Sequence, residues 1–253
     1  MQLIFLGSGS AFTVGGDNYQ SNMMLVSPRG KRMLIDCGSD ARFALFDLGL
    51  NHRDISDIYI SHLHADHVGG LEWIAFTSIF DQPRHRIKLH AAEVLYKPLW
   101  ENVLCGGLSS LQGKEPSFDI FFDLHPIRDN SSFEWEGIRF SIVQTIHALC
   151  GYKILPSYGI KFTSGKHKVF ITTDTQFAPH QIIDFYEEAT VIFQDCETAQ
   201  FASGVHAHYN ELITLPDHIK NKMWLYHYQP GPLPNAKKDG FIGFVAKGQS
   251  FNF

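Results

Sequence analysis

The chain has few cysteines, and none of them form a closely spaced pair. Its four cysteines are Cys37, Cys105, Cys150 and Cys196, with no Cys-x-x-Cys motif among them. Cysteines scattered in this way are not typical of a disulfide framework. We expect reduced thiols in an intracellular protein. Cys150 follows a histidine by three residues and could supply a thiolate ligand, but the preferred role is that of a small buried apolar side chain.

Long apolar runs and clusters of basic residues are also missing. The first apolar run, Leu3 to Leu6, ends at Gly7 without basic residues before it, and no run approaches the length of a membrane span. Basic residues occur at most in pairs such as Lys31-Arg32, and the formal net charge is -5. A surface that grips extended nucleic acid by charge is therefore not expected. We predict a cytoplasmic protein without a membrane partner.

The composition is that of a soluble globular protein. Hydrophobic residues make up 44% of the 253 positions and charged residues 19%. This length allows one large domain or two small ones. No linker or low-complexity tract divides the chain, so we expect residues 1–253 to form a single domain.

Alternating strand and helix patterns run through the whole sequence. Apolar β-type runs predict strands at 1–6, 22–27, 32–36, 58–60, 86–90, 118–124, 133–135, 139–146, 158–163, 168–172, 190–194 and 222–226. Helical spacing predicts helices at 40–48, 71–80, 93–105, 181–188 and 210–219. The pattern favours an α/β fold built from two similar halves.

One short stretch, SHLHADHVGG at residues 61–70, holds four metal-binding side chains. Imidazole nitrogen and carboxylate oxygen are ligands of borderline divalent ions, and a turn of backbone can aim alternate side chains at two neighbouring points. We assign His62 and His64 to one ion, and Asp66 and His67 to a second. The alternative is a solvated histidine-rich loop, which the dense spacing after a strand disfavours.

Other candidate residues lie where later strands are predicted to end. They are His147, Asp174, Glu197 and His227. Functional sites in α/β sheets gather at the carboxyl ends of strands. A catalytic two-metal site needs about three protein ligands per ion and a bridging group. His147 would complete the first shell and His227 the second, while Asp174 would bridge both ions. His90 is left outside this site.

These motifs resemble those of the metallo-β-lactamase fold hydrolases. The resemblance rests on the HLHADH loop, on His147, on Asp174 within TTDT and on His227 within LYHY, and the early segments LGSGSA and IDCG are similar as well. It implies a four-layer αβ/βα sandwich of two mixed sheets flanked by helices. It also implies two divalent metal ions at one edge, Zn²⁺ in the first place, with Mn²⁺ or iron as alternatives.

Asp66 and the GSGSA opening look most like the phosphodiesterase branch that includes ribonuclease Z. In that branch a glutamate at a strand end and a following histidine assist the chemistry. The resemblance therefore implies Asp66, Glu197 and His206 as catalytic residues, with His206 a better match than His208. In this assignment His206, assisted by Glu197, protonates the leaving ribose oxygen. Cys196 stands where the branch has a histidine.

The long tRNA-gripping arm of ribonuclease Z does not fit between residues 147 and 174. The chain is more similar to small cyclic-nucleotide phosphodiesterases of this fold, a group that includes phage anti-Pycsar proteins, which destroy cyclic pyrimidine nucleotide signals. We predict a dinuclear-metal phosphodiesterase for a small, cyclic nucleotide. The alternatives are a tRNA 3′-end endonuclease, a diiron sensor that binds dioxygen, and a lactone or thioester hydrolase. A homodimer is also expected, in which segment 93–112 places Tyr96 or Trp100 near the neighbouring site.

Overall fold

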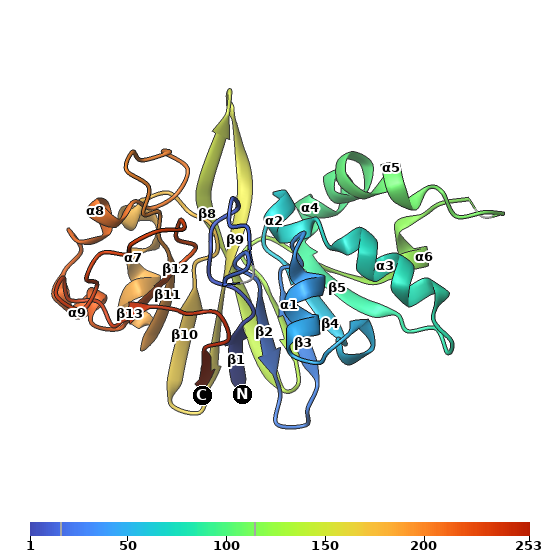
Figure 1. Ribbon diagram of the computed structural model, residues 1–253, viewed down its shortest axis with the longest axis horizontal. Coiled ribbons are helices and arrows are strands. Elements are labelled where there is room, and N and C mark those ends of the chain that lie inside the picture. Colours follow the sequence, from blue (N-terminus) through green and yellow to red (C-terminus); the bar gives the residue numbers. More distant parts are fainter. Residues whose placement is uncertain (16, 114) are drawn as a thin grey trace.

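The chain folds as two halves, each rich in strands, with helices on the outside (Figure 1). The computed structural model describes residues 1–15, 17–113 and 115–253. The first half contains β1 (Gln2–Phe5), β2 (Met23–Val26), β3 (Arg32–Ile35), α1 (Ala41–Asp47), η1 (His52–Asp54), β4 (Asp57–Ile60), α2 (Ala65–Val68), α3 (Leu71–Phe80), β5 (Ile87–Ala92), α4 (Glu93–Pro98), η2 (Leu99–Leu104), α5 (Cys105–Leu108), α6 (Phe118–Phe121) and β6 (Phe122–Ile127). The second half contains β7 (Ser132–Trp135), β8 (Ile138–Cys150), β9 (Lys153–Ser164), β10 (His167–Ile171), α7 (Pro179–Glu188), β11 (Val191–Asp195), α8 (Tyr209–Leu212), α9 (Asp217–Lys220), β12 (Met223–Tyr226), β13 (Gly243–Phe244) and β14 (Ser250–Asn252).

Two seven-stranded mixed sheets form the centre of the molecule. Their strand orders are β14-β1-β2-β3-β4-β5-β6 and β13-β12-β11-β10-β9-β8-β7. The last strand, β14, pairs antiparallel with β1, so the two chain ends lie side by side (Figure 1). With α1, α3 and α4 outside the first sheet and α7 outside the second, this arrangement confirms the predicted αβ/βα sandwich.

Aromatic side chains hold the inner faces of the two sheets together. Phe5 of β1 is fully buried, and its ring centre lies 5.2 Å from that of Phe193 in β11 and 5.4 Å from that of Tyr226 in β12. Burial of one such side chain stabilises the fold by roughly 1.5–3 kcal/mol. Strands β3 to β6 run parallel in one sheet and β10 to β13 in the other. This packing brings the carboxyl ends of both parallel sets to one edge of the sandwich.

Two segments form different elements from those predicted. Residues 118–124 are not one strand, because 118–121 form helix α6, which buries Phe118 and Phe121 on one side. Residues 210–219 are not one helix but α8 and α9, with Pro216 preceding α9. Proline disfavours the helical conformation of the residue before it, which is consistent with the break between the two helices. In the described part of the chain no helix is long and apolar enough to cross a membrane.

The β8–β9 hairpin is longer than the predicted strands at 139–146 and 158–163. Its ladder shifts by one residue between Ile146 and Ala148, which is a β-bulge at His147. His147 therefore lies within β8, not beyond the end of a strand as predicted. A bulge bends its strand and redirects one side chain, and this allows a residue in the middle of a hairpin to reach the site.

Beyond the bulge the hairpin projects from the body of the protein (Figure 1). Leu149, Tyr152 and Ile154 expose their side chains on this projection. Cys150 is exposed there too, so the prediction that it is a small buried residue is wrong. All four cysteines are free thiols, as expected from their spacing.

Candidate metal centre

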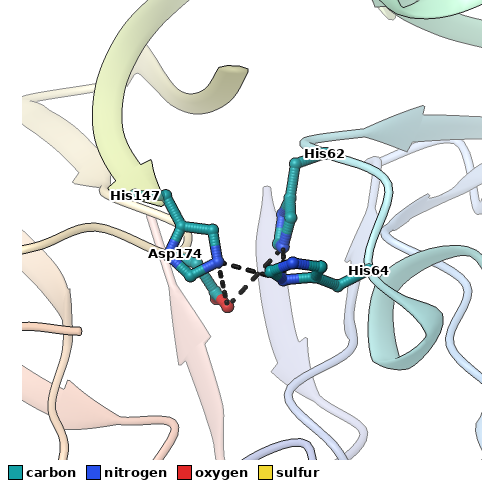
Figure 2. A group of neighbouring side chains, drawn as sticks. All are labelled: His62, His64, His147 and Asp174. Carbon is teal, nitrogen blue, oxygen red and sulfur yellow. Dashed lines mark hydrogen bonds and ion pairs between the residues drawn. The ribbon is translucent and has the colours of Figure 1, made fainter. Parts of the chain in front are cut away.

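Three histidines and one aspartate converge where the loop after β4 meets β8 and the end of β10 (Figure 2). The ring centres of His62, His64 and His147 lie 4.7 to 4.9 Å from one another. Nε2 of His62 lies 3.7 Å from Oδ2 of Asp174, and Nε2 of His147 lies 3.8 Å from it. Ligand atoms at about 2.1 Å from one ion would be about 3.4 Å apart in a tetrahedral shell. The first group thus has the spacing of a metal site.

A second group shares the same aspartate. Asp66 and His67 lie in α2, and His227 directly follows β12. Oδ2 of Asp66 lies 3.1 Å from Nε2 of His67 and 3.4 Å from Nε2 of His227. Oδ2 of Asp174 lies 3.2 Å and 3.5 Å from the same two nitrogen atoms. Asp174 consequently stands between the two groups, in the position that a bridging carboxylate requires.

The buried polar atoms of these groups fit a pair of cations. Asp174 is 1% exposed and its Oδ1 atom has no hydrogen-bond partner in the described structure, and Nε2 of His67 has none either. Burying unpartnered carboxylate and imidazole atoms costs free energy that a bound cation would offset. Burial lowers the pKa of His62 well below its usual value, and a neutral imidazole is the form that binds metal.

Asp36, which directly follows β3, orients His67 although sequence reasoning gave it no role in the site. Its Oδ2 accepts a hydrogen bond from Nδ1 of His67 at 2.7 Å. Its carboxylate also accepts bonds from the backbone nitrogen and hydroxyl of Ser61, at 2.8 and 2.7 Å. A carboxylate on the second ring nitrogen fixes the tautomer of a ligand histidine. The available signal was the position of Asp36 at the end of the predicted strand 32–36.

Backbone strain is concentrated at these strand ends. Asp36, Thr173 and His227 have positive φ values of 66°, 51° and 65°. Non-glycine residues in this region cost of order 1–3 kcal/mol each, and they persist where surrounding contacts impose them. The loops that carry the candidate ligands are thus held in a specific conformation.

Gly38 lets the HADH turn pack closely against the first sheet. A Cβ atom at this position would lie 1.9 Å from the carbonyl oxygen of Asp66. The backbone nitrogen of Gly38 also donates to Oδ1 of Asn22 at 2.6 Å. The close contact explains why a glycine stands here, and it ties the position of Asp66 to the loop after β3.

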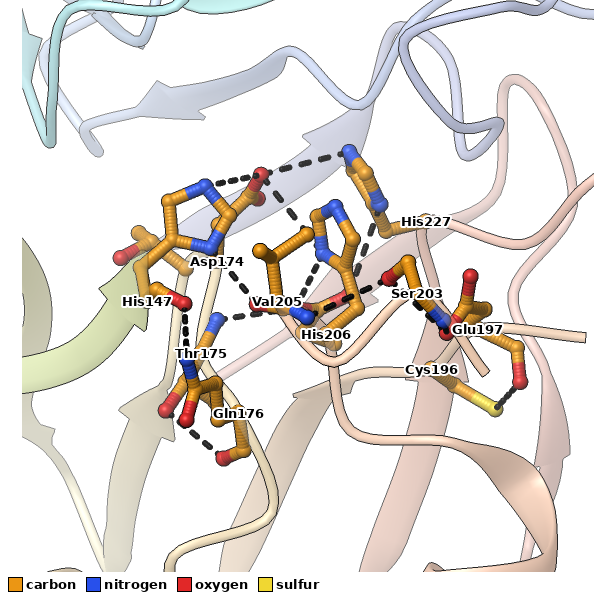
Figure 3. A network of polar contacts seen from close by, with 12 residues as sticks. His147, Asp174, Thr175, Gln176, Cys196, Glu197, Ser203, Val205, His206 and His227 are labelled. Carbon is orange, nitrogen blue, oxygen red and sulfur yellow. Dashed lines mark hydrogen bonds and ion pairs between the residues drawn. The ribbon is translucent and has the colours of Figure 1, made fainter. Parts of the chain in front are cut away.

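His206 lies next to Asp174 and His227 of the candidate centre (Figure 3), and its Nδ1 atom pairs with Asp195. Its ring stacks on His227 with centres 4.6 Å apart, and Nδ1 donates to Oδ2 of Asp195 at 2.8 Å. Burial lowers the pKa of His206, but the charge of Asp195 and this hydrogen bond outweigh it and raise the pKa to about 9. The hydrogen bond to Asp195 and the charge of that carboxylate favour the protonated form of His206.

The expected pairing of Glu197 with His206 is wrong. Oε2 of Glu197 accepts bonds from the backbone nitrogen and hydroxyl of Ser203, at 2.8 and 3.1 Å (Figure 3). Asp195, not Glu197, lies next to His206, because Asp195 is the last residue of β11 and reaches the site. Glu197 forms hydrogen bonds within the loop that follows β11. The sequence signal for Asp195 was its position at the end of predicted strand 190–194.

The loop after β11 also contacts His147. The carbonyl oxygen of Val205 accepts a hydrogen bond from Nδ1 of His147 at 2.8 Å, and Nε2 of Gln176 donates to the carbonyl oxygen of His147 at 2.7 Å (Figure 3). The first bond leaves Nε2 of His147 free to face the other candidate ligands. Glu197 is consequently bonded to the same loop whose Val205 carbonyl oxygen contacts His147.

His206 also belongs to a third close group. A ring nitrogen of His206 and one possible metal-ligand atom from each of Asp174, Asp195 and His227 all lie within 4.8 Å of one another. The geometry therefore allows His206 to act as a proton donor or as a metal ligand. His208 is placed differently: it caps α8 by accepting from the backbone nitrogen of Asn210.

Three other residues considered in the sequence lie outside the site. His90 pairs with Asp57 in the first sheet. The hydroxyl of Tyr96 donates to the carbonyl oxygen of Leu89, and the Trp100 ring stacks on Phe118 at 5.5 Å. Both aromatic side chains are thus packed against their own chain.

The sandwich with ligand groups at one edge defines the class of protein: the chain has the metallo-β-lactamase fold. It is similar to the metallo-beta-lactamase fold protein YhfI of Bacillus subtilis, with a TM-score of 0.76, 17% identity and coverage of 99% of this chain and 98% of that one. It is also similar to the short form of human tRNase Z, with a TM-score of 0.71, 18% identity and coverage of 100% and 99%.

Within this class, the chain belongs to the Anti-Pycsar protein Apyc1 family, which matches residues 1–251. The Anti-Pycsar protein Apyc1 of Paenibacillus harenae is 37% identical over 230 residues, which cover 90% of each chain. The family resemblance inferred from the sequence motifs is confirmed.

Proposed function

We propose that this protein is a metal-dependent phosphodiesterase that hydrolyses a small cyclic nucleotide. The observation that supports this most directly is the position of Asp174, whose Oδ2 atom faces the histidines of both ligand groups. Membership in the Anti-Pycsar family supports a cyclic nucleotide as the substrate.

Two Zn²⁺ ions are the proposed cofactors. One would be held by His62, His64 and His147 and the other by Asp66, His67 and His227, with Asp174 between them. Nitrogen and oxygen donors without thiolates suit zinc, and also manganese and iron. When bound, such ions neutralise charge on the phosphate and lower the pKa of water.

His206 would give its proton to the leaving ribose oxygen. Asp195 favours the protonated ring and holds it in place. Side-chain exposure of 13% leaves His206 partly open to the site. Asp66 serves this proposal as a ligand, since its carboxylate faces His67 and His227. Glu197 acts as a positioning residue for the loop that contacts His147.

A small substrate fits the net charge of the chain. The net charge is -5, so metal ions rather than a basic surface would attract the phosphate.

We also propose a cytoplasmic homodimer. The exposed apolar side chains of the hairpin, Leu149, Tyr152 and Ile154, support contact with a second copy. Analytical ultracentrifugation should give twice the mass of the chain, and a monomer would overturn the dimer.

The decisive experiment is metal analysis of the purified protein, followed by a screen of cyclic mononucleotides and dinucleotides against a tRNA precursor. We expect two ions per chain and opening of a cyclic mononucleotide to a linear product. Preferred cleavage of the tRNA precursor would favour the endonuclease. Iron with a visible absorption band and no hydrolysis would favour the dioxygen sensor.

His206→Ala should keep both ions while turnover falls, whereas loss of an ion would make His206 a ligand.

A further inference from the structure

The β-bulge at His147 leaves the β8–β9 ladder incomplete at a candidate ligand. The register passes from the pair of Ile146 and Pro156 directly to a pair that contains Ala148, so His147 has no partner on β9. The extra residue of a bulge is unpaired in the ladder, and the proline opposite Ile146 has no N–H to donate. Because His147 is fully buried, the carbonyl groups of this part of β8 need donors from another segment.

The segment that follows β10 supplies these donors (Figure 3). The side-chain amide of Gln176 donates to the carbonyl oxygen of His147 at 2.7 Å. The backbone nitrogen of Gln176 donates to the carbonyl oxygen of Ile146 at 2.6 Å, and the hydroxyl of Thr175 donates to the same oxygen at 3.2 Å. Gln176 thus bonds two consecutive carbonyl groups at the bulge, one with its main chain and the other with its side chain.

These bonds restrict the backbone of His147, whereas a different loop restricts its ring. The carbonyl oxygen of Val205, after β11, accepts from Nδ1 of His147 at 2.8 Å. Gln176 lies two residues after Asp174, whose carbonyl oxygen accepts from the hydroxyl of Thr145 in β8 at 3.1 Å. The segment that carries the candidate bridging carboxylate is therefore also the one that fixes the bulge.

Among the candidate ligands, the Gln176 side chain bonds to His147 alone within the described part of the chain. His147 belongs to the first ligand group, with His62, His64 and Asp174. The other three residues of the second group lie in α2 and directly after β12. A change confined to the Gln176 side chain should consequently affect the two groups unequally.

We propose that Gln176 is a positioning residue, which aims His147 by fixing the bulge and thereby sets the affinity of the first ligand group for its ion. The proposal rests on the two-ion site of the proposed function. Groups that hold a ligand residue in place typically contribute about 10- to 100-fold to metal affinity. We expect a loss of this size at the first group when the amide of Gln176 is removed, and no loss at the second.

Zinc competition with the variant Gln176→Met tests this proposal, since methionine has nearly the same length and no N–H. Titration of the zinc-loaded protein with a chromogenic chelator should show one ion bound about 10- to 100-fold more weakly and the other bound as before. Gln181→Met is the matched control, because Nε2 of Gln181 donates to the carbonyl oxygen of Gln144 at 2.8 Å, on the same strand but outside the bulge. The control should keep both affinities.

The variant His147→Ala assigns the weakened ion. It should lose one ion, and adding Gln176→Met to it should leave the affinity for the remaining ion unchanged. A lower affinity for that remaining ion would overturn the proposal, because Gln176 would then act on both groups. Full affinity for both ions in Gln176→Met would overturn it as well.

Histidine ¹⁵N spectra of the metal-free protein separate this proposal from the proposed function. Gln176→Met should shift the ring signals of His147 and leave those of His67 in place. Unshifted His147 signals would reject the positioning role whatever the metal content. Fewer than two zinc ions in the unchanged protein would instead contradict the proposed function, and the His147 signals would then decide the role of Gln176.

Discussion

Replacing Asp195 by asparagine tests whether His206 acts as a charged proton donor. Oδ2 of Asp195 accepts from Nδ1 of His206 at 2.8 Å and from the backbone nitrogen of Thr175 at 2.8 Å. Asparagine has nearly the same size and retains an oxygen for Thr175. It removes the negative charge that raises the pKa of His206.

The size of the effect follows from this contact. A hydrogen bond to a charged group contributes about 1.5–3 kcal/mol, and each 1.4 kcal/mol corresponds to about tenfold in rate. We therefore expect Asp195→Asn to lower kcat about 10- to 100-fold. His206→Asn should lower kcat at least as much. If Asp195 acts through His206, the double variant should be no slower than His206→Asn alone.

The assay measures kcat, KM and bound metal with a cyclic mononucleotide as substrate. Glu197→Gln is the matched control, because it also removes one buried carboxylate charge, but from a group bonded to Ser203. It should lower kcat less than Asp195→Asn does. Full activity in Asp195→Asn would refute the reasoning. Oδ1 of Asp195 also lies 3.4 Å from Nδ1 of His227. Loss of metal in Asp195→Asn would therefore show that Asp195 serves to retain the metal rather than to charge His206.

Three further predictions concern metal content and stability. Asp174→Ala should lose both ions and all turnover, while His64→Ala should lose one ion, as measured by elemental analysis. Gly38→Ala should lower the unfolding free energy by about 1–3 kcal/mol in urea denaturation, since its Cβ would clash with the Asp66 backbone. Burial raises the pKa of Asp57, but hydrogen bonds from a histidine and a tryptophan outweigh it and lower the pKa below the usual 3.8. The ionised Asp57 carboxylate therefore contributes its full stabilisation above pH 3.8, and this contribution is lost as the pH falls through the lower pKa that Asp57 has in the folded protein. Asp57→Asn should weaken this dependence of the unfolding free energy on pH, as measured by denaturation at a series of pH values.

The part of the site that the sequence predicts best is the part that is local in the chain. His62, His64, Asp66 and His67 lie within one loop and one helical turn, so their spacing alone limits where their side chains point. Asp174 and His227 follow strands whose apolar runs are clear in the sequence. The position of these residues at one edge then follows from the parallel order of the strands.

The parts that were missed depend on contacts between distant segments. His147 was placed after a strand because its neighbours stop alternating there, but the structure shows a bulge that shifts the register of a longer hairpin. Asp195 and Glu197 are both acidic residues near the end of β11, and only the packing of the following loop decides which one meets His206. Sequence spacing contains no information on that choice.

Both halves of the fold place a buried aspartate at a strand end to fix the site. Asp36 follows β3 and Asp195 ends β11, and each accepts a backbone hydrogen bond from the loop after a neighbouring strand, at Ser61 and at Thr175. Ser61 directly precedes the candidate ligand loop and Thr175 directly follows Asp174, so these bonds tie the ligand positions to the sheets. Each aspartate also holds a histidine of the site. A centre built in this way is preorganised, and we infer that metal binding changes its backbone little, because both sheets already hold the ligand loops in place.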